Sequence, residues 1–251
     1  MVEDNGLGFD EQYLSKIFMP PRYLLNTHPL AVVRHVEMVA RLKENLKTEQ
    51  TTAFVLDIRE DKKGGVWEIS FISRDRPGLF SDIAGVMALN NINILSTHIY
   101  TWRDGTVVDI FTVTRPMDSY RLDETWQKVE RNLKETFSGR LSLSYRLGQK
   151  AAPSILSPKK PVRPPEVVVD NKTSDFFTVI EVFAPDRVGL LHLITRTLFD
   201  LRLDIRVAKT GVKGDQIADI FYVRDLEGQK LEDESQVNEI KNALLYQLDR
   251  P

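Results

Sequence analysis

An internal repeat is the feature of this sequence that most constrains its fold. Residues 67–113 and residues 177–223 carry the same motifs in the same order: a D-R-x-G-L motif, an apolar stretch and a D-I-F motif. The corresponding pairs, at a constant offset of 111 residues, are Asp75 and Asp186, Gly78 and Gly189, and Asn93 and Asp204. The D-I-F motifs are 110 residues apart, so the second copy has lost one residue. A repeat of this length predicts two copies of one supersecondary unit.

Within each copy the spacing of apolar residues changes from two to about 3.6 and back, which predicts a strand, a helix and then strands again. In the first copy, apolar residues alternate over 67–71 and then follow helical spacing over 79–87. Residues 94–101 and 106–114 are strand candidates on either side of an Asp-Gly turn. A second helical stripe follows, formed by Trp126, Val129 and Leu133. The predicted order is β-α-β-β-α.

The second copy predicts the same order. Its strand candidates are 176–183, 204–211 and 216–223, and its helix candidates are 190–201 and the segment that carries Val237, Ile240, Leu244 and Leu248. A short strand candidate also precedes each copy, at 52–58 and at 167–169. We expect each of these to pair with the first strand of its copy and to occupy the place of a closing strand. Residues 141–147 are a competing closing strand for the first copy.

Helical and proline-rich segments flank the copies. We expect one short helix over 10–18, a break at Met19-Pro20-Pro21, and a longer helix that begins near Thr27 and Pro29. Its apolar face consists of Val32, Val36, Val39 and Leu46. Residues 146–172 hold five of the chain's 12 prolines and six basic residues against two acidic ones, which indicates an extended linker.

These patterns predict an α+β protein with two ferredoxin-like units, each an antiparallel sheet with two helices on one face. The expected divisions are a helical lead-in over 1–50, a first domain over 51–147, a basic Pro-rich linker over 148–166 and a second domain over 167–251. We further expect the two units to associate, within or between chains, because an isolated sheet of this kind leaves an edge of unpaired backbone groups.

The composition excludes several classes of function. The formal net charge is −2, which argues against the basic surface that nucleic-acid binding needs. The chain has no cysteine, so disulfides, zinc–cysteine sites and thiol nucleophiles are excluded. It also lacks a run of about 18 apolar residues and the layout of a signal peptide. We therefore expect a cytoplasmic protein that binds neither nucleic acid nor a membrane.

The turn between the first strand and the first helix of each copy is the candidate binding site. Its glycine lets the backbone approach another group closely, and the N–H groups that begin the following helix favour a carboxylate or phosphate. The aspartate of each turn has two open interpretations: it caps the helix, or it accepts a hydrogen bond from a ligand ammonium group. The candidate ligand-binding residues are Asp75, Arg76, Gly78, Leu79, Asn93, Asp186, Arg187, Gly189, Leu190 and Asp204.

These motifs carry a resemblance to a known family. The succession D-R-P-G-L, helix, N-I-N-I and a hairpin ending in D-I-F-T-V resembles an ACT domain, a small-molecule sensor that commonly binds amino acids. Two copies preceded by M-P-P-R-Y-L-L-N-T-H-P-L-A-V-V-R-H resemble the C-terminal region of bifunctional PII uridylyltransferase/uridylyl-removing enzymes. The resemblance implies a glutamine sensor without cofactors, and it implies a catalytic domain or a PII-type protein as partner.

The resemblance also implies how the ligand is held. Its carboxylate would bind the N–H groups near Gly78-Leu79 and Gly189-Leu190, and the aspartates and Asn93 would contact its amino group or side-chain amide. The copies differ, because Val188 and Asp204 stand where the first copy has Pro77 and Asn93. Two alternatives follow: the sites differ in affinity, or one of them is purely structural.

Catalysis by this chain alone is not expected. The Gly-Ser pair with spaced acidic ligands of a nucleotidyltransferase and the His-Asp doublet of a metal-dependent phosphohydrolase are both missing. The four histidines, His28, His35, His98 and His192, are scattered and indicate no metal set, although His192 is a candidate ligand contact. Residues 2–10 resemble an adenine-binding box, but the companion motifs of that ATPase fold are absent. The main alternative is a ligand-free interaction module.

Overall fold

The computed structural model describes residues 19–49, 53–61, 65–116, 121–150, 163–213 and 216–249. The N-terminal box over 2–10 and the helix expected over 10–18 lie outside these residues. The lead-in contains α2 (Pro21–Asn26) and α3 (Pro29–Glu49). The longer helix that was predicted from Thr27 and Pro29 is thereby confirmed.

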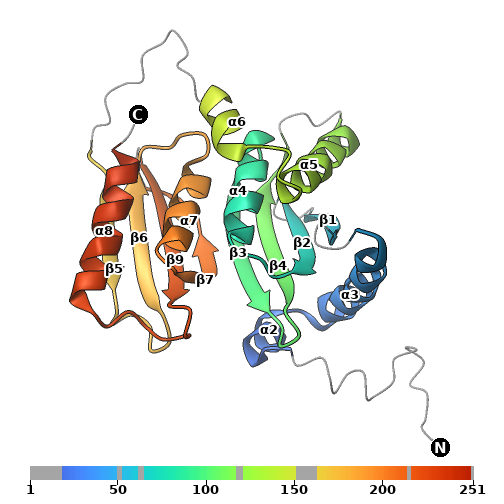
Figure 1. The fold of residues 1–251 in the computed structure, drawn as a ribbon, viewed down its shortest axis with the longest axis horizontal. Coiled ribbons are helices and arrows are strands. Elements are labelled where there is room, and N and C mark those ends of the chain that lie inside the picture. The colour runs from blue at the N-terminus through green and yellow to red at the C-terminus, as the bar shows by residue number, and fades with distance from the viewer. Residues whose placement is uncertain are drawn as a thin grey trace, which may run out of the picture. The chain divides into compact units, whose positions relative to one another are not determined.

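The first repeat, with its preceding strand, contains β1 (Phe54–Asp61), β2 (Val66–Arg74), α4 (Leu79–Leu89), β3 (Ile94–Thr101), β4 (Thr106–Thr114), α5 (Leu122–Phe137) and α6 (Leu143–Lys150). The second contains β5 (Glu166–Asp170), β6 (Thr178–Ala184), α7 (Leu190–Asp200), β7 (Asp204–Lys209), β8 (Val212–Lys213), β9 (Gln216–Arg224) and α8 (Glu234–Leu248). Each repeat therefore has the predicted β-α-β-β-α order, and the expected α+β class is confirmed (Figure 1).

The strands follow one another in the hydrogen-bonded order β1-β2-β4-β3-β7-β9-β6-β5, and β8 pairs with β9. In the second repeat β6 pairs antiparallel with β9 from Thr178↔Val223 to Ala184↔Ile217. The strand β5 pairs with the other side of β6, from Glu166↔Phe183 to Asp170↔Val179. The prediction that a strand ahead of each copy pairs with its first strand is confirmed.

The two repeats associate within the chain. The strand β3 pairs antiparallel with β7, with Ser96 opposite Lys209 and His98 opposite Val207. The Thr210 N–H extends this contact by donating to the Leu95 carbonyl oxygen at 2.9 Å. The helices α4 and α7, one from each repeat, also pack side by side (Figure 1). The prediction that the repeats associate, within or between chains, is therefore confirmed as an association within the chain.

The described chain divides into two compact units that do not follow the repeat. The first unit comprises the residues up to Asp57 together with 70–75 and 99–109; the second comprises 58–69, 76–98 and the residues from Ile110 onward. In the first unit, Tyr23 Oη lies 2.8 Å from His35 Nδ1, and His35 Nε2 lies 2.8 Å from Ser70 Oγ. All three side chains are buried, so the network anchors α2 and α3 to β2.

Two expectations about the middle of the chain are wrong. Residues 141–147 do not form a closing strand, because 143–150 form the helix α6. The alternation of Leu141, Leu143 and Tyr145 suggested a strand, but Leu143 and Leu147 lie on the buried face of a helix and Tyr145 is exposed. The extended linker is also shorter than expected at both ends, since 146–150 are helical and β5 begins at Glu166.

Among the described residues, no helix is both long enough and apolar enough to cross a membrane.

Candidate functional site

The two D-R-x-G-L turns adopt the same backbone conformation. Gly78 has φ +73° and is the N-cap of α4, and Gly189 has φ +81° and is the N-cap of α7. This left-handed conformation is unfavourable for a residue with a Cβ, which explains the glycine. Because the N-cap is glycine, no N-cap side chain satisfies the first-turn N–H groups. Asp75 and Asp186 are therefore not the N-cap residues of these helices.

The surroundings of the first turn are charged and aromatic. A Cβ placed on Gly78 would lie 3.7 Å from Arg196 Nη1 and 3.8 Å from the Phe199 ring, both on α7 of the other repeat. Arg196 is half-exposed, and its Nε lies 3.1 Å from Asp200 Oδ1. A guanidinium group thus stands beside the positive end of the α4 dipole, which is a favourable place for a carboxylate.

At the second turn, the glycine faces an aliphatic side chain. A Cβ on Gly189 would lie 3.3 Å from Leu147 Cδ1, and its two next-nearest neighbours are atoms of the same leucine. Leu147 belongs to α6 and is 5% exposed. The two candidate turns therefore have the same backbone but different chemistry.

The arginines of the turns are engaged within their own repeats. Arg76 pairs with Asp82 of α4, and its guanidinium carbon lies 4.1 Å from the centroid of the Phe137 ring. Arg187 Nη2 donates to the Gln247 carbonyl oxygen at 3.0 Å. Burial lowers the pKa of Arg187 from its ordinary value. The expected ligand contacts of Arg76 and Arg187 stay predictions.

Asn93 and Asp204 lie at the far end of the helix from the glycine of their own repeat. The helix α4 has 11 residues, which corresponds to about 16 Å of rise. Asn93 is exposed, and its N–H donates to Thr114 Oγ1 at 3.1 Å. Asp204 pairs with Arg206. The C-terminal end of α4 is therefore too far from Gly78 to share a site with it. The C-terminal end of α7, in the other repeat, is close enough, because Phe199 lies next to Gly78.

The remaining expected site residues are placed as follows. Asp75 and Asp186 are exposed, and the Asp75 N–H donates to the Gly105 carbonyl oxygen at 3.0 Å. Leu79 and Leu190 are buried as the first residues of their helices. The two leucines therefore contribute packing, and only their backbone is suited to a ligand contact.

His192 lies at the interface between α4 and α7. Its Nδ1 donates to the Ser81 carbonyl oxygen at 2.7 Å. A Cβ on Gly85 would lie 2.9 Å from the same nitrogen, so the absence of a side chain at Gly85 leaves room for the imidazole. These contacts give His192 a role in joining the repeats, and its expected ligand contact stays a prediction.

A buried carboxylate near the second turn was missed by the sequence analysis. Asp219 on β9 is 4% exposed, and its counterpart Asp109 on β4 is 1% exposed. Burial and, to a smaller extent, the negative charge of Asp186 raise the pKa of Asp219 to about 7, and a hydrogen bond from the Gly211 backbone opposes both effects. The signal was present in the sequence, because both D-I-F motifs place an aspartate between apolar residues of a strand.

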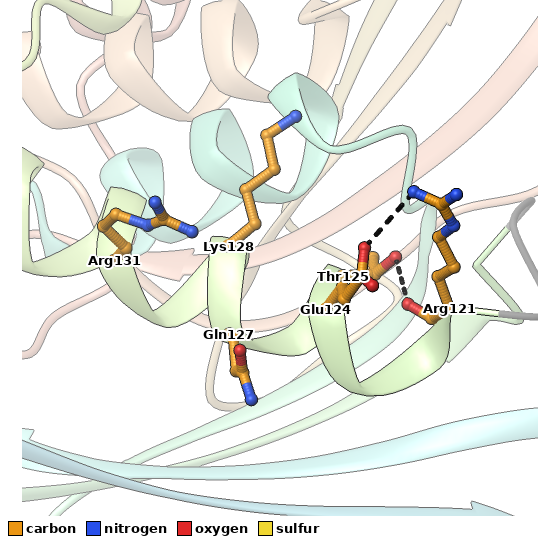
Figure 2. A pocket seen from close by; sticks show the side chains of 6 residues that line it. All are labelled: Arg121, Glu124, Thr125, Gln127, Lys128 and Arg131. Atoms are coloured by element: carbon orange, nitrogen blue, oxygen red, sulfur yellow. Dashed lines mark hydrogen bonds and ion pairs between the residues drawn. The ribbon is translucent and has the colours of Figure 1, made fainter.

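A polar groove on α5 is separate from these turns. It is lined by Arg121, Glu124, Thr125, Gln127, Lys128 and Arg131 (Figure 2). The Arg121 guanidinium lies 3.5 Å from Glu124 Oε2, and the Thr125 hydroxyl donates to the Arg121 carbonyl oxygen at 3.1 Å. All six residues come from α5 and its N-cap, and none is an expected site residue. The groove is best interpreted as the solvated face of this helix.

Comparison with known proteins agrees with this architecture. A model of the ACT domain matches residues 67–131, and a model of the ACR family N-terminal ACT domain matches residues 173–248. The bifunctional uridylyltransferase/uridylyl-removing enzyme of Rhodospirillum rubrum is 33% identical over 241 residues, which cover 93% of this chain and 24% of that protein. The enzyme of the same description from Novosphingobium aromaticivorans is 38% identical over 185 residues, which cover 72% of this chain and 20% of that protein.

The chain thus spans less than a quarter of the length of these curated relatives. The two matched models account for both repeats, and the Rhodospirillum rubrum match extends beyond them to 93% of this chain. The chain therefore carries two ACT domains in tandem, and it is similar to the ACT-bearing part of bifunctional uridylyltransferase/uridylyl-removing enzymes.

Proposed function

We propose that this chain is the amino-acid-sensing regulatory part of a PII uridylyltransferase/uridylyl-removing enzyme of nitrogen control, with glutamine as its ligand. By itself it does not catalyse uridylyl transfer or removal, and it acts in the cytoplasm on an attached catalytic domain or with a PII-type protein. The observation that carries the proposal is the Gly78 turn, where the N-terminus of α4 meets Arg196 of the other repeat.

This arrangement suits the carboxylate of an α-amino acid. The first-turn N–H groups of α4 would donate to the carboxylate oxygens, and Arg196 would supply a charge-assisted hydrogen bond. Arg196 is paired with Asp200, so the ligand competes with Asp200 for the guanidinium. Over the two turns, the proposed contacts to the ligand's amino and amide groups are Asp75, Asn93, Asp186 and Asp204.

A ligand at this turn would contact both repeats. It would bridge the start of α4 and the end of α7, and so favour the arrangement in which these helices pack together. A ligand shifts an equilibrium only by its difference in affinity for the two states. Glutamine would therefore act by stabilising the association of the repeats, which the catalytic part would sense.

Isothermal titration of the chain with glutamine tests the proposal. We expect saturable heat with glutamine, and a loss of at least tenfold in affinity in Arg196→Gln. The matched control is Arg140→Gln, which removes an exposed arginine outside α4 and α7 and should leave the affinity unchanged. Equal affinity in both variants would remove Arg196 from the site.

The ligand-free interaction module is the second candidate function. It is favoured by one observation, namely that the protein's own strand pairing of β3 with β7 and the packing of α4 on α7 join the two repeats. Absence of heat with glutamine and with a panel of other amino acids would favour this function.

A further inference from the structure

The helix α6 makes the two turns unequal. It follows α5 of the first repeat, yet its Leu147 covers the Gly189 turn of the second, with Cδ1 3.3 Å from the position of a Gly189 Cβ. Leu143, one helical turn earlier, is also buried. The helix α6 thus lies against α4 (Figure 1), and its two leucines lie next to Gly85 of α4 and Gly189 at the start of α7.

Its last residue fixes α6 to the end of α4. Lys150 Nζ donates to the carbonyl oxygens of Ala88 and Leu89, at 2.7 Å and 2.9 Å. These are C-terminal carbonyl groups of a helix, where a cation is favourable. Burial and the nearby charge of Lys128 lower the pKa of Lys150. The contact at Lys150 is therefore specific, because a partly buried ammonium group is held by two oriented acceptors.

The difference between the two turns also appears in the sequences of α4 and α7, which are equivalent helices of the two repeats. The residue of α4 that corresponds to Arg196 at the offset of 111 is Gly85. A Cβ on Gly85 would lie 2.9 Å from Leu143 Cδ1, so glycine leaves room for α6 to approach α4. In the first repeat this position admits an aliphatic cover, whereas in the second it supplies the guanidinium that faces Gly78.

We propose that α6 is an intrachain cover that occupies the ligand position of the second ACT domain, so that the tandem holds one amino acid, at the Gly78 turn. This inference rests on the proposed function for the identity of the ligand. It assigns Leu147 as the residue that excludes the ligand from the Gly189 turn and Lys150 as the residue that holds the cover in place.

Leu147→Ser and Tyr145→Ser form a matched pair for the test. Both replace a large side chain of α6 with a small uncharged one, but Leu147 is buried against Gly189 and Tyr145 is 63% exposed. Amide spectra of the wild-type chain titrated with glutamine should show Gly78 shifting and Gly189 unchanged, with one glutamine per chain by calorimetry. Leu147→Ser should bind two and shift both glycines, and Tyr145→Ser should behave as wild type. A shift of Gly189 in the wild-type chain would overturn the proposal.

Hydrogen exchange separates failure of the cover from failure of the proposed function. Without any ligand, the first-turn amides of Leu191 and His192 should exchange at least tenfold faster in Leu147→Ser than in Tyr145→Ser. Equal exchange would overturn the cover. Faster exchange without glutamine binding in any variant would contradict the proposed ligand and retain the cover. Should Leu147→Ser not fold, as judged by circular dichroism, Leu147→Ala and Tyr145→Ala replace the pair with the same expectations.

Discussion

His192 Nδ1 donates a hydrogen bond of 2.7 Å to the carbonyl oxygen of Ser81, the residue that corresponds to it at the repeat offset of 111. The two equivalent positions thus meet where α4 and α7 pack together. Ser81 is also within 3.1 Å of the same nitrogen through Oγ. A contact between equivalent residues indicates an approximate twofold relation between the two helices at this point.

Gly85→Ala should destabilise the chain. The added Cβ would lie 2.9 Å from both His192 Nδ1 and Leu143 Cδ1, and such overpacking costs about 1–3 kcal/mol. The control is Gly148→Ala on α6, whose Cβ would meet nothing within 4 Å and which gains helix propensity of up to about 1 kcal/mol. Urea unfolding measures both. Equal stability of the two variants would show that α4 and α7 separate readily.

Replacing each turn glycine with valine should distinguish backbone strain from loss of glutamine binding. Gly78→Val and Gly189→Val both force a β-branched residue into a left-handed conformation, at a cost of about 1–3 kcal/mol each. We expect similar losses of stability from the two variants, but loss of glutamine binding only in Gly78→Val. Calorimetry and urea unfolding together check this. Retention of binding by Gly78→Val would exclude the first turn.

Asp219 should make the chain less stable as the pH rises from about 4 to 7. Its pKa is raised to about 7 in the folded state, from an ordinary value of 3.8, so between these values the folded chain holds a proton that the unfolded chain has lost. The free energy of unfolding then falls with rising pH, by about 1.4 kcal/mol for each pKa unit as an upper limit. Urea unfolding at pH 4, 5.5 and 7 measures the slope.

Asp219→Asn should flatten this dependence, and the exposed Asp175→Asn should retain it. An unchanged slope in Asp219→Asn would mean that another group carries the effect.

Tyr23→Phe should weaken the attachment of the lead-in helices. Burial raises the pKa of Tyr23, and removing its hydroxyl deprives the buried His35 Nδ1 of a hydrogen-bond partner, at a cost of about 1–3 kcal/mol. Tyr145→Phe is the matched control, because Tyr145 Oη contacts Gln149 on the surface and its loss should cost less than about 0.5 kcal/mol. Thermal unfolding compares the two variants, and equal melting temperatures would argue against the network.

Glutamine should raise the thermal stability of the chain. A ligand that binds only the folded state stabilises it by about 2.7 kcal/mol when its free concentration is about 100 times its dissociation constant. This gain corresponds to several degrees in melting temperature. Scanning fluorimetry with millimolar glutamine measures it, with Arg196→Gln as the control that should not respond. Uridylylation of a PII-type protein by the chain alone would contradict the non-catalytic part of the proposal.

The order of elements was accessible from the sequence because it depends on local patterns. The change of apolar spacing at Leu79 and the Asp-Gly turn at Gly105 are local signals, and the spacing change recurs 111 residues later at Leu190, which supports the same interpretation for both copies. The same reasoning failed over 141–147, where Leu141, Leu143 and Leu147 fit both a strand and a helix. The burial of Leu143 and Leu147 against α4 and the Gly189 turn selected the helix.

The sequence by itself determined the two repeats and the glycine-led turns at Gly78 and Gly189, since each is set by residues that are close along the chain. Only the tertiary structure decided that Gly78 faces Arg196 and that Gly189 faces Leu147. Apolar spacing shows which face of an element is buried but carries no information about which distant element covers it. The pairing of β3 with β7 and the docking of α6 supply that information, and they make two turns of identical backbone chemically different.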